Sequence, residues 1–92
     1  MNIVAEMSLY PLKEGPIPTI ISFIKALREQ EGIEIVTNQL SSQVSGSFEA
    51  VTSAVNRCMK TVMETQDTVV LVVKYLNVEK ELDRAPTLTP GA

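Results

Sequence analysis

Hydrophobic and polar residues alternate over the first segment of the chain, residues 2–10. One side of the segment carries Ile3, Ala5, Met7 and Leu9, and the other carries Val4, Glu6, Ser8 and Tyr10. A period of two residues predicts a β-strand with one face toward a core. The following stretch, PLKEGPIP, holds three prolines and a glycine. These residues break regular structure, so we expect the strand to end there.

Two later segments have the spacing of amphipathic helices. The first is predicted from about Pro18 to Glu31, with Gly32 just past its end. The second is predicted to begin at Ser47, a good N-cap, and to run to about Glu64. The apolar positions of the two helices are Ile20, Phe23, Ile24 and Leu27 in the first, and Phe48, Val51, Val55, Cys58, Met59 and Val62 in the second.

Three more segments predict strands: 33–37, 40–45 and 68–76. A tight connection around Asn38–Gln39 is expected to join the first two of these. The resulting order is β-α-β-β-α-β, which with right-handed crossovers gives a four-stranded antiparallel sheet with both helices on one face. The predicted class is therefore α+β, a ferredoxin-like plait. We expect it to occupy residues 1–78, followed by a flexible tail, residues 79–92, that is poor in apolar side chains.

The last predicted strand does not alternate, because residues 69–73 are apolar on both faces. An antiparallel sheet with one bare face should alternate apolar and polar residues. One explanation is that a strand of five β-forming residues is hydrophobic on both faces without any partner. We favour another, in which a partner subunit covers this face, because an exposed row of valines promotes aggregation. The chain is then a homo-oligomer, a dimer or a tetramer, assembled through its open sheet face.

The composition narrows the possible functions. The 92 residues carry a formal net charge of −3, which argues against nucleic acid as a partner. No apolar run is long enough for a membrane span, and the start of the chain lacks the basic region of a signal peptide. The single cysteine, Cys58, fits a reducing cytoplasm, which is the expected location. The chain has no His, so His-based catalysis is excluded, and we expect neither a metal nor a cofactor.

The stretch TNQLSSQVSG, residues 37–46, is polar but uncharged in a chain rich in Val, Ile and Leu. Its amides and hydroxyls either satisfy the backbone of their own turn or line a pocket for a polar small molecule. Tyr10 offers a flat ring on which an aromatic ligand can stack. The candidate ligand-binding residues are Ser8, Tyr10, Thr37, Asn38, Ser41, Ser42 and Gln43.

The segments EMSLYPL and TNQLSSQVSG, each followed by a helix, together with the Val-rich last strand, resemble the thiamine-binding protein family, the YkoF-like proteins. The likeness covers about residues 2–78. It implies a ferredoxin-like, oligomeric protein without catalytic activity that binds thiamine or its hydroxymethylpyrimidine part. Some members of that family carry the domain twice, whereas this chain carries it once. The resemblance therefore implies that two or more copies assemble in place of the tandem domain.

The chemistry of the candidate residues agrees with that ligand, since an aminopyrimidine offers donors and acceptors in one plane. Glu6 either lies near the cationic thiazolium ring of thiamine or pairs with Lys74 across the strands. Two alternatives remain open. The first is an ACT-like oligomerisation or regulatory module that binds another metabolite or a protein partner. An acylphosphatase-type enzyme is the weaker alternative, because that chemistry needs an Arg in the first loop, where this chain has Lys13.

Overall fold

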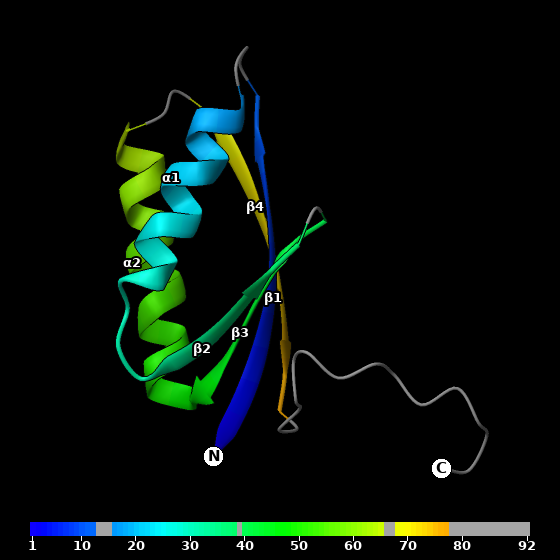
Figure 1. The fold of residues 1–92 in the computed structure, drawn as a ribbon, viewed down its shortest axis with the longest axis vertical. Coiled ribbons are helices and arrows are strands. Elements are labelled where there is room, and N and C mark those ends of the chain that lie inside the picture. Colours follow the sequence, from blue (N-terminus) through cyan, green and yellow to red (C-terminus); the bar gives the residue numbers. More distant parts are fainter. Residues whose placement is uncertain (13–15, 39, 66–67, 78–92) are drawn as a thin grey trace, which may run out of the picture.

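The computed structural model of the chain describes residues 1–12, 16–38, 40–65 and 68–77. Six elements follow one another along it: β1 (Asn2–Pro11), α1 (Pro16–Arg28), β2 (Ile33–Thr37), β3 (Ser42–Ser47), α2 (Phe48–Thr65) and β4 (Val69–Leu76). The strands form one antiparallel sheet in the order β2-β3-β1-β4. Both helices lie on the same face of this sheet (Figure 1). The predicted ferredoxin-like plait is confirmed.

The register of the sheet follows from the alternation in β1. Ile3, Ala5 and Met7 are buried beneath the helices. Because cross-strand neighbours point to the same face, Val44 of β3, which pairs with Ala5, also joins the core. The helices complete the core with Phe23 and Leu27 of α1 and with Val51, Val55, Cys58 and Val62 of α2.

The ends of the elements differ from the sequence-based prediction in three places. Helix α1 spans 16–28 instead of 18–31, and Gly32 then adopts a positive φ of 78° before β2 begins. Strand β3 spans 42–47 instead of 40–45, because the connection after β2 takes up four residues, 38–41. Ser47 caps α2 as predicted, since its Oγ accepts a hydrogen bond from the Ala50 N–H at 3.1 Å.

The predicted apolar stripe of α2 is wrong at its first position. Phe48 is 47% exposed, because it lies in the first turn, where the helix starts beside the N-terminal end of β1. Its N–H donates to the carbonyl oxygen of Met1 at 2.9 Å. Cys58 is buried as predicted, and this burial raises the pKa of its thiol, with the nearby Glu29 carboxylate raising it further.

Strand β4 has the two apolar faces that its sequence predicts. Val69, Leu71 and Val73 pack against the core, whereas Val70 and Val72 point away from the helices and are 43% and 44% exposed. No helix in the described part of the chain is long and apolar enough to cross a membrane. The predicted boundary at residue 78 and the tail, 79–92, lie outside the described residues.

Candidate functional site

The face of the sheet opposite the helices carries most of the polar chemistry of the strands. We call it the open face. The register places there Val4, Glu6, Ser8 and Tyr10 of β1, Gln43 and Ser45 of β3, Glu34 and Val36 of β2, and Val70, Val72, Lys74 and Leu76 of β4. The described residues contain no element that packs over this face (Figure 1).

A hydrogen-bonded polar group lies near the middle of the open face. Glu6 on the central strand β1 is flanked by Gln43 on β3 and by Lys74 on β4. The Ser41 hydroxyl donates to Glu6 Oε2 at 3.3 Å and accepts a hydrogen bond from the Gln43 amide. These contacts fix one carboxylate oxygen and leave the side chains partly accessible. We name Glu6, Ser41 and Gln43 the polar triad.

The other oxygen of Glu6 faces Lys74, with 3.8 Å between Lys74 Nζ and Glu6 Oε1. This distance makes an ion pair but is longer than a charge-assisted hydrogen bond. The cross-strand pairing of Glu6 with Lys74, one of the two alternatives from the sequence, is therefore present in the structure.

Ser8 and Tyr10 continue the open face along β1, beyond the polar triad. Their cross-strand neighbours on β4 are Val72 and Val70, so one polar side chain and one aromatic ring stand beside exposed apolar groups. Four of the seven candidate ligand-binding residues are thus brought to one surface: Ser8, Tyr10, Ser41 and Gln43.

Thr37 and Ser42 lie on the other side of the sheet. Ser42 of β3 pairs with the core residue Met7 of β1 and is itself buried. Its hydroxyl shares a hydrogen bond of 3.2 Å with that of Thr37, its neighbour on β2. The two hydroxyls satisfy each other at the edge of the core, so they do not join the open-face group.

The Asn38 side chain forms hydrogen bonds within its own turn. Its Oδ1 accepts hydrogen bonds from the N–H groups of Leu40 and Ser41, at 2.9 and 3.1 Å. The Asn38 N–H also donates to the Ser41 carbonyl oxygen at 3.1 Å. This is the turn-satisfying arrangement that Asn often adopts, and it holds Ser41 where its hydroxyl reaches Glu6. Gln39 lies outside the described residues.

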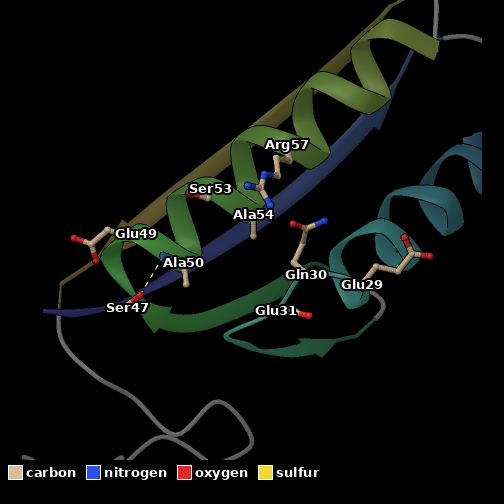
Figure 2. Close-up of a pocket in the computed structure, with 9 residues that line it drawn as sticks. All are labelled: Glu29, Gln30, Glu31, Ser47, Glu49, Ala50, Ser53, Ala54 and Arg57. Carbon is tan, nitrogen blue, oxygen red and sulfur yellow. Dashed lines mark hydrogen bonds between the residues drawn. The ribbon is translucent and has the colours of Figure 1, made fainter.

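A separate pocket of about 670 Å³ opens on the helical layer, away from all seven candidate residues. It lies between the segment after α1 and the first three turns of α2 (Figure 2). The residues that line it are Glu29, Gln30, Glu31, Ser47, Glu49, Ala50, Ser53, Ala54 and Arg57. The loop approaches α2 closely here, since a Cβ at Gly32 would lie 3.5 Å from that of Ala50.

The pocket combines three carboxylates and one guanidinium, and most of these side chains are exposed. Gln30 Nε2 donates to the Ala26 carbonyl oxygen at 3.2 Å and so helps to cap α1. In the described part of the chain, every buried side-chain nitrogen or oxygen has a partner, and no group of acidic or thiol side chains is arranged to hold a metal ion. The pocket therefore presents solvated charges without a polar group that requires a ligand.

The sequence pattern did not predict this pocket, because the residues that line it come from two segments that no motif links. It did identify the open face through Ser8, Tyr10 and the polar stretch. It left Glu6 and Lys74 out of the candidate ligand-binding residues, although it offered their pairing as one of two alternatives. The alternation of β4 and its antiparallel pairing with β1 place Lys74 beside Glu6.

Comparison with known proteins shows structural neighbours only. No family model and no curated protein matches the chain. The Streptococcus pneumoniae protein SP2199 superposes with a TM-score of 0.78 at 24% identity, over 90% of this chain and 92% of that one. A Thermotoga maritima protein with a suggested role in thiamine biosynthesis or salvage superposes with a TM-score of 0.72 at 16% identity, over 82% of each chain.

A further neighbour is a domain of unknown function, DUF77, from Bacillus cereus. It has a TM-score of 0.70 and 11% identity, and the match covers 96% of this chain and 84% of that one. At such identities the likeness establishes the shared fold, which agrees with the ferredoxin-like topology described above.

Proposed function

We propose that this protein binds thiamine or a related aminopyrimidine such as hydroxymethylpyrimidine, without catalysing a reaction. The observation that carries the proposal is the polar triad on a sheet face that no described element covers. Ser41 and Gln43 offer hydroxyl and amide groups beside the Glu6 carboxylate. A planar aminopyrimidine, with an amine donor and ring-nitrogen acceptors, matches groups of this kind.

Tyr10 extends the proposed site along β1. Residues four apart on one strand are about 13 Å apart, so Glu6 and Tyr10 bracket a surface long enough for a ligand of two linked rings. The valines at 70 and 72 give this surface an apolar border. The Thermotoga maritima neighbour, with its suggested role in thiamine biosynthesis or salvage, supports this class of ligand.

We further propose that the open face is covered by a second copy of the chain. A ligand on a bare sheet would remain half in water, whereas ligand sites usually bury most of the ligand surface. The outward valines of β4 supply an apolar surface for such an assembly. They also favour the second candidate function, an ACT-like oligomerisation or regulatory module with another metabolite or a protein partner.

Calorimetric titration of the wild-type protein with thiamine and with hydroxymethylpyrimidine tests the proposal. Loss of one partner of a buried hydrogen bond costs about 1–3 kcal/mol, which is a factor of about five to 150 in affinity. We expect Ser41→Ala and Tyr10→Ala to weaken binding. The control Ser53→Ala removes an exposed hydroxyl on α2 and should leave binding unchanged.

Absence of binding by either compound at millimolar concentration would overturn the proposal and leave the ACT-like module as the better account. Binding that survives in both Ser41→Ala and Tyr10→Ala would place the ligand elsewhere than the open face.

A further inference from the structure

The ion pair on the open face differs from an ordinary surface pair in how its carboxylate is held. Glu6 Oε2 is fixed by the Ser41 hydroxyl at 3.3 Å, and Ser41 is fixed in turn by Gln43 and by the Asn38 turn. Glu6 therefore has a hydrogen-bonded orientation that does not depend on Lys74. Its second oxygen, Oε1, is the one that faces Lys74.

Lys74 is held much more loosely than Glu6. In the single chain its side chain is 77% exposed, compared with 45% for Glu6, and its Nζ lies 3.8 Å from Oε1. Exposed ion pairs of this kind contribute little free energy, because water already solvates the ammonium group well. Displacing Lys74 from Oε1 is therefore inexpensive, while the carboxylate stays in place.

We propose that Glu6 selects ligands by charge and that Lys74 occupies its free oxygen until a cationic ligand displaces it. This inference rests on the proposed function, since it assigns charge selectivity to the same surface. The ligand class is a heterocycle that carries a positive ring, and Lys74 acts as a competitor that weakens its binding. A neutral heterocycle lacks the charge–charge attraction to Glu6 Oε1, so it competes less effectively with Lys74.

Two substitutions should change the selectivity in opposite directions. Lys74→Met keeps much of the side-chain length but removes the competing charge, so thiamine should bind up to about five-fold more tightly. Glu6→Gln keeps the shape and an oxygen that can accept from Ser41, but it removes the charge. Thiamine should then bind about five-fold more weakly or worse. The affinity of neutral hydroxymethylpyrimidine, measured above neutral pH, should change less than that of thiamine in both variants, because the neutral ligand has no charge–charge attraction to lose or gain.

Helix α2 offers a matched control pair. Lys60 Nζ and Glu64 Oε1 are also 3.8 Å apart, and Lys60 is 78% exposed, but this pair lies on the helical layer. Lys60→Met and Glu64→Gln alter the net charge by the same amounts as the test substitutions. They should leave both affinities unchanged.

The measured quantity is the ratio of the thiamine affinity to the hydroxymethylpyrimidine affinity, from calorimetry at low salt. A change in assembly affects both ligands alike, so the ratio isolates the charge effect. A ratio that rises in Lys74→Met and falls in Glu6→Gln supports the inference. A ratio unchanged in both variants, while wild type binds both compounds, overturns the charge selection and leaves the proposed function standing. Absence of binding of both compounds to wild type overturns the two together.

Discussion

The outward valines of β4 make the proposed assembly measurable. Val72 lies on the open face opposite Ser8 and is 44% exposed in the single chain. Full burial of a valine side chain contributes about 1.5–3 kcal/mol, so the exposed part represents about 0.7–1.3 kcal/mol per subunit. In a two-fold dimer each substitution counts twice, which gives about 1.3–2.6 kcal/mol.

We therefore expect Val72→Lys to raise the dissociation constant of the assembly by about ten- to seventy-fold. The lysine charge adds a desolvation cost, so this range is a lower bound. The monomer should still fold, because the side chain points away from the core. Val73→Lys on the same strand should instead unfold the protein, since Val73 packs against the core.

Sedimentation equilibrium over a range of concentrations measures this effect, with circular dichroism to verify folding. Ile21→Lys is the matched control: it is 46% exposed on α1, away from the open face, and should leave association unchanged. A wild-type protein that sediments at 10.1 kDa at tens of micromolar would refute the reasoning. So would a folded Val72→Lys variant that associates as tightly as wild type.

Three further predictions concern stability. Asn38→Ala removes the acceptor of two hydrogen bonds from turn N–H groups and should lower the free energy of unfolding, measured by urea titration, by about 1 kcal/mol. Weaker thiamine binding at an unchanged melting temperature would instead favour a direct contact between Asn38 and the ligand. Gly46→Ala places a Cβ 2.7 Å from the Gly32 carbonyl oxygen, so the free energy of unfolding should fall by about 1–3 kcal/mol in urea denaturation. An unchanged midpoint of unfolding would contradict this close approach. Because burial raises the pKa of the Cys58 thiol from its ordinary value of 9.0, its contribution to stability is complete below that value and is lost as pH rises through the raised pKa. Urea titrations at increasing alkaline pH should show this loss in wild type and not in Cys58→Ala, and equal pH dependence of the two proteins would contradict it.

The sequence by itself determined the elements and the faces they bury. Ile3, Ala5 and Met7 of β1 recur at every second position and enter the core beneath the helices, whereas Val4 has the opposite parity and is buried on the open face. The same logic applies to Phe23 and Leu27, which share one side of a helical turn. Local periodicity is enough for these predictions, because it depends on backbone geometry that every strand or helix shares.

The tertiary structure decided how the polar stretch divides between the two faces of the sheet. The register of β3 depends on the length of the preceding turn, and a shift of one residue moves every side chain to the opposite face. The sequence pattern did not fix that length, because Asn38 and Ser41 close the turn through hydrogen bonds between specific atoms. As a result Thr37 and Ser42 bond to each other on the core side, while Gln43 joins the open face.

The polar triad was also beyond local patterns, and the sequence left the pairing of Glu6 with Lys74 as one of two alternatives. Glu6, Ser41 and Lys74 are far apart in the chain, and they meet only because β1 pairs with β3 on one side and with β4 on the other. The pocket on the helical layer has the same origin, since the loop after α1 reaches α2 at the close approach of Gly32 to Ala50. Periodicity along the chain determines which side of an element is buried, but only the packing of elements determines which side chains become neighbours.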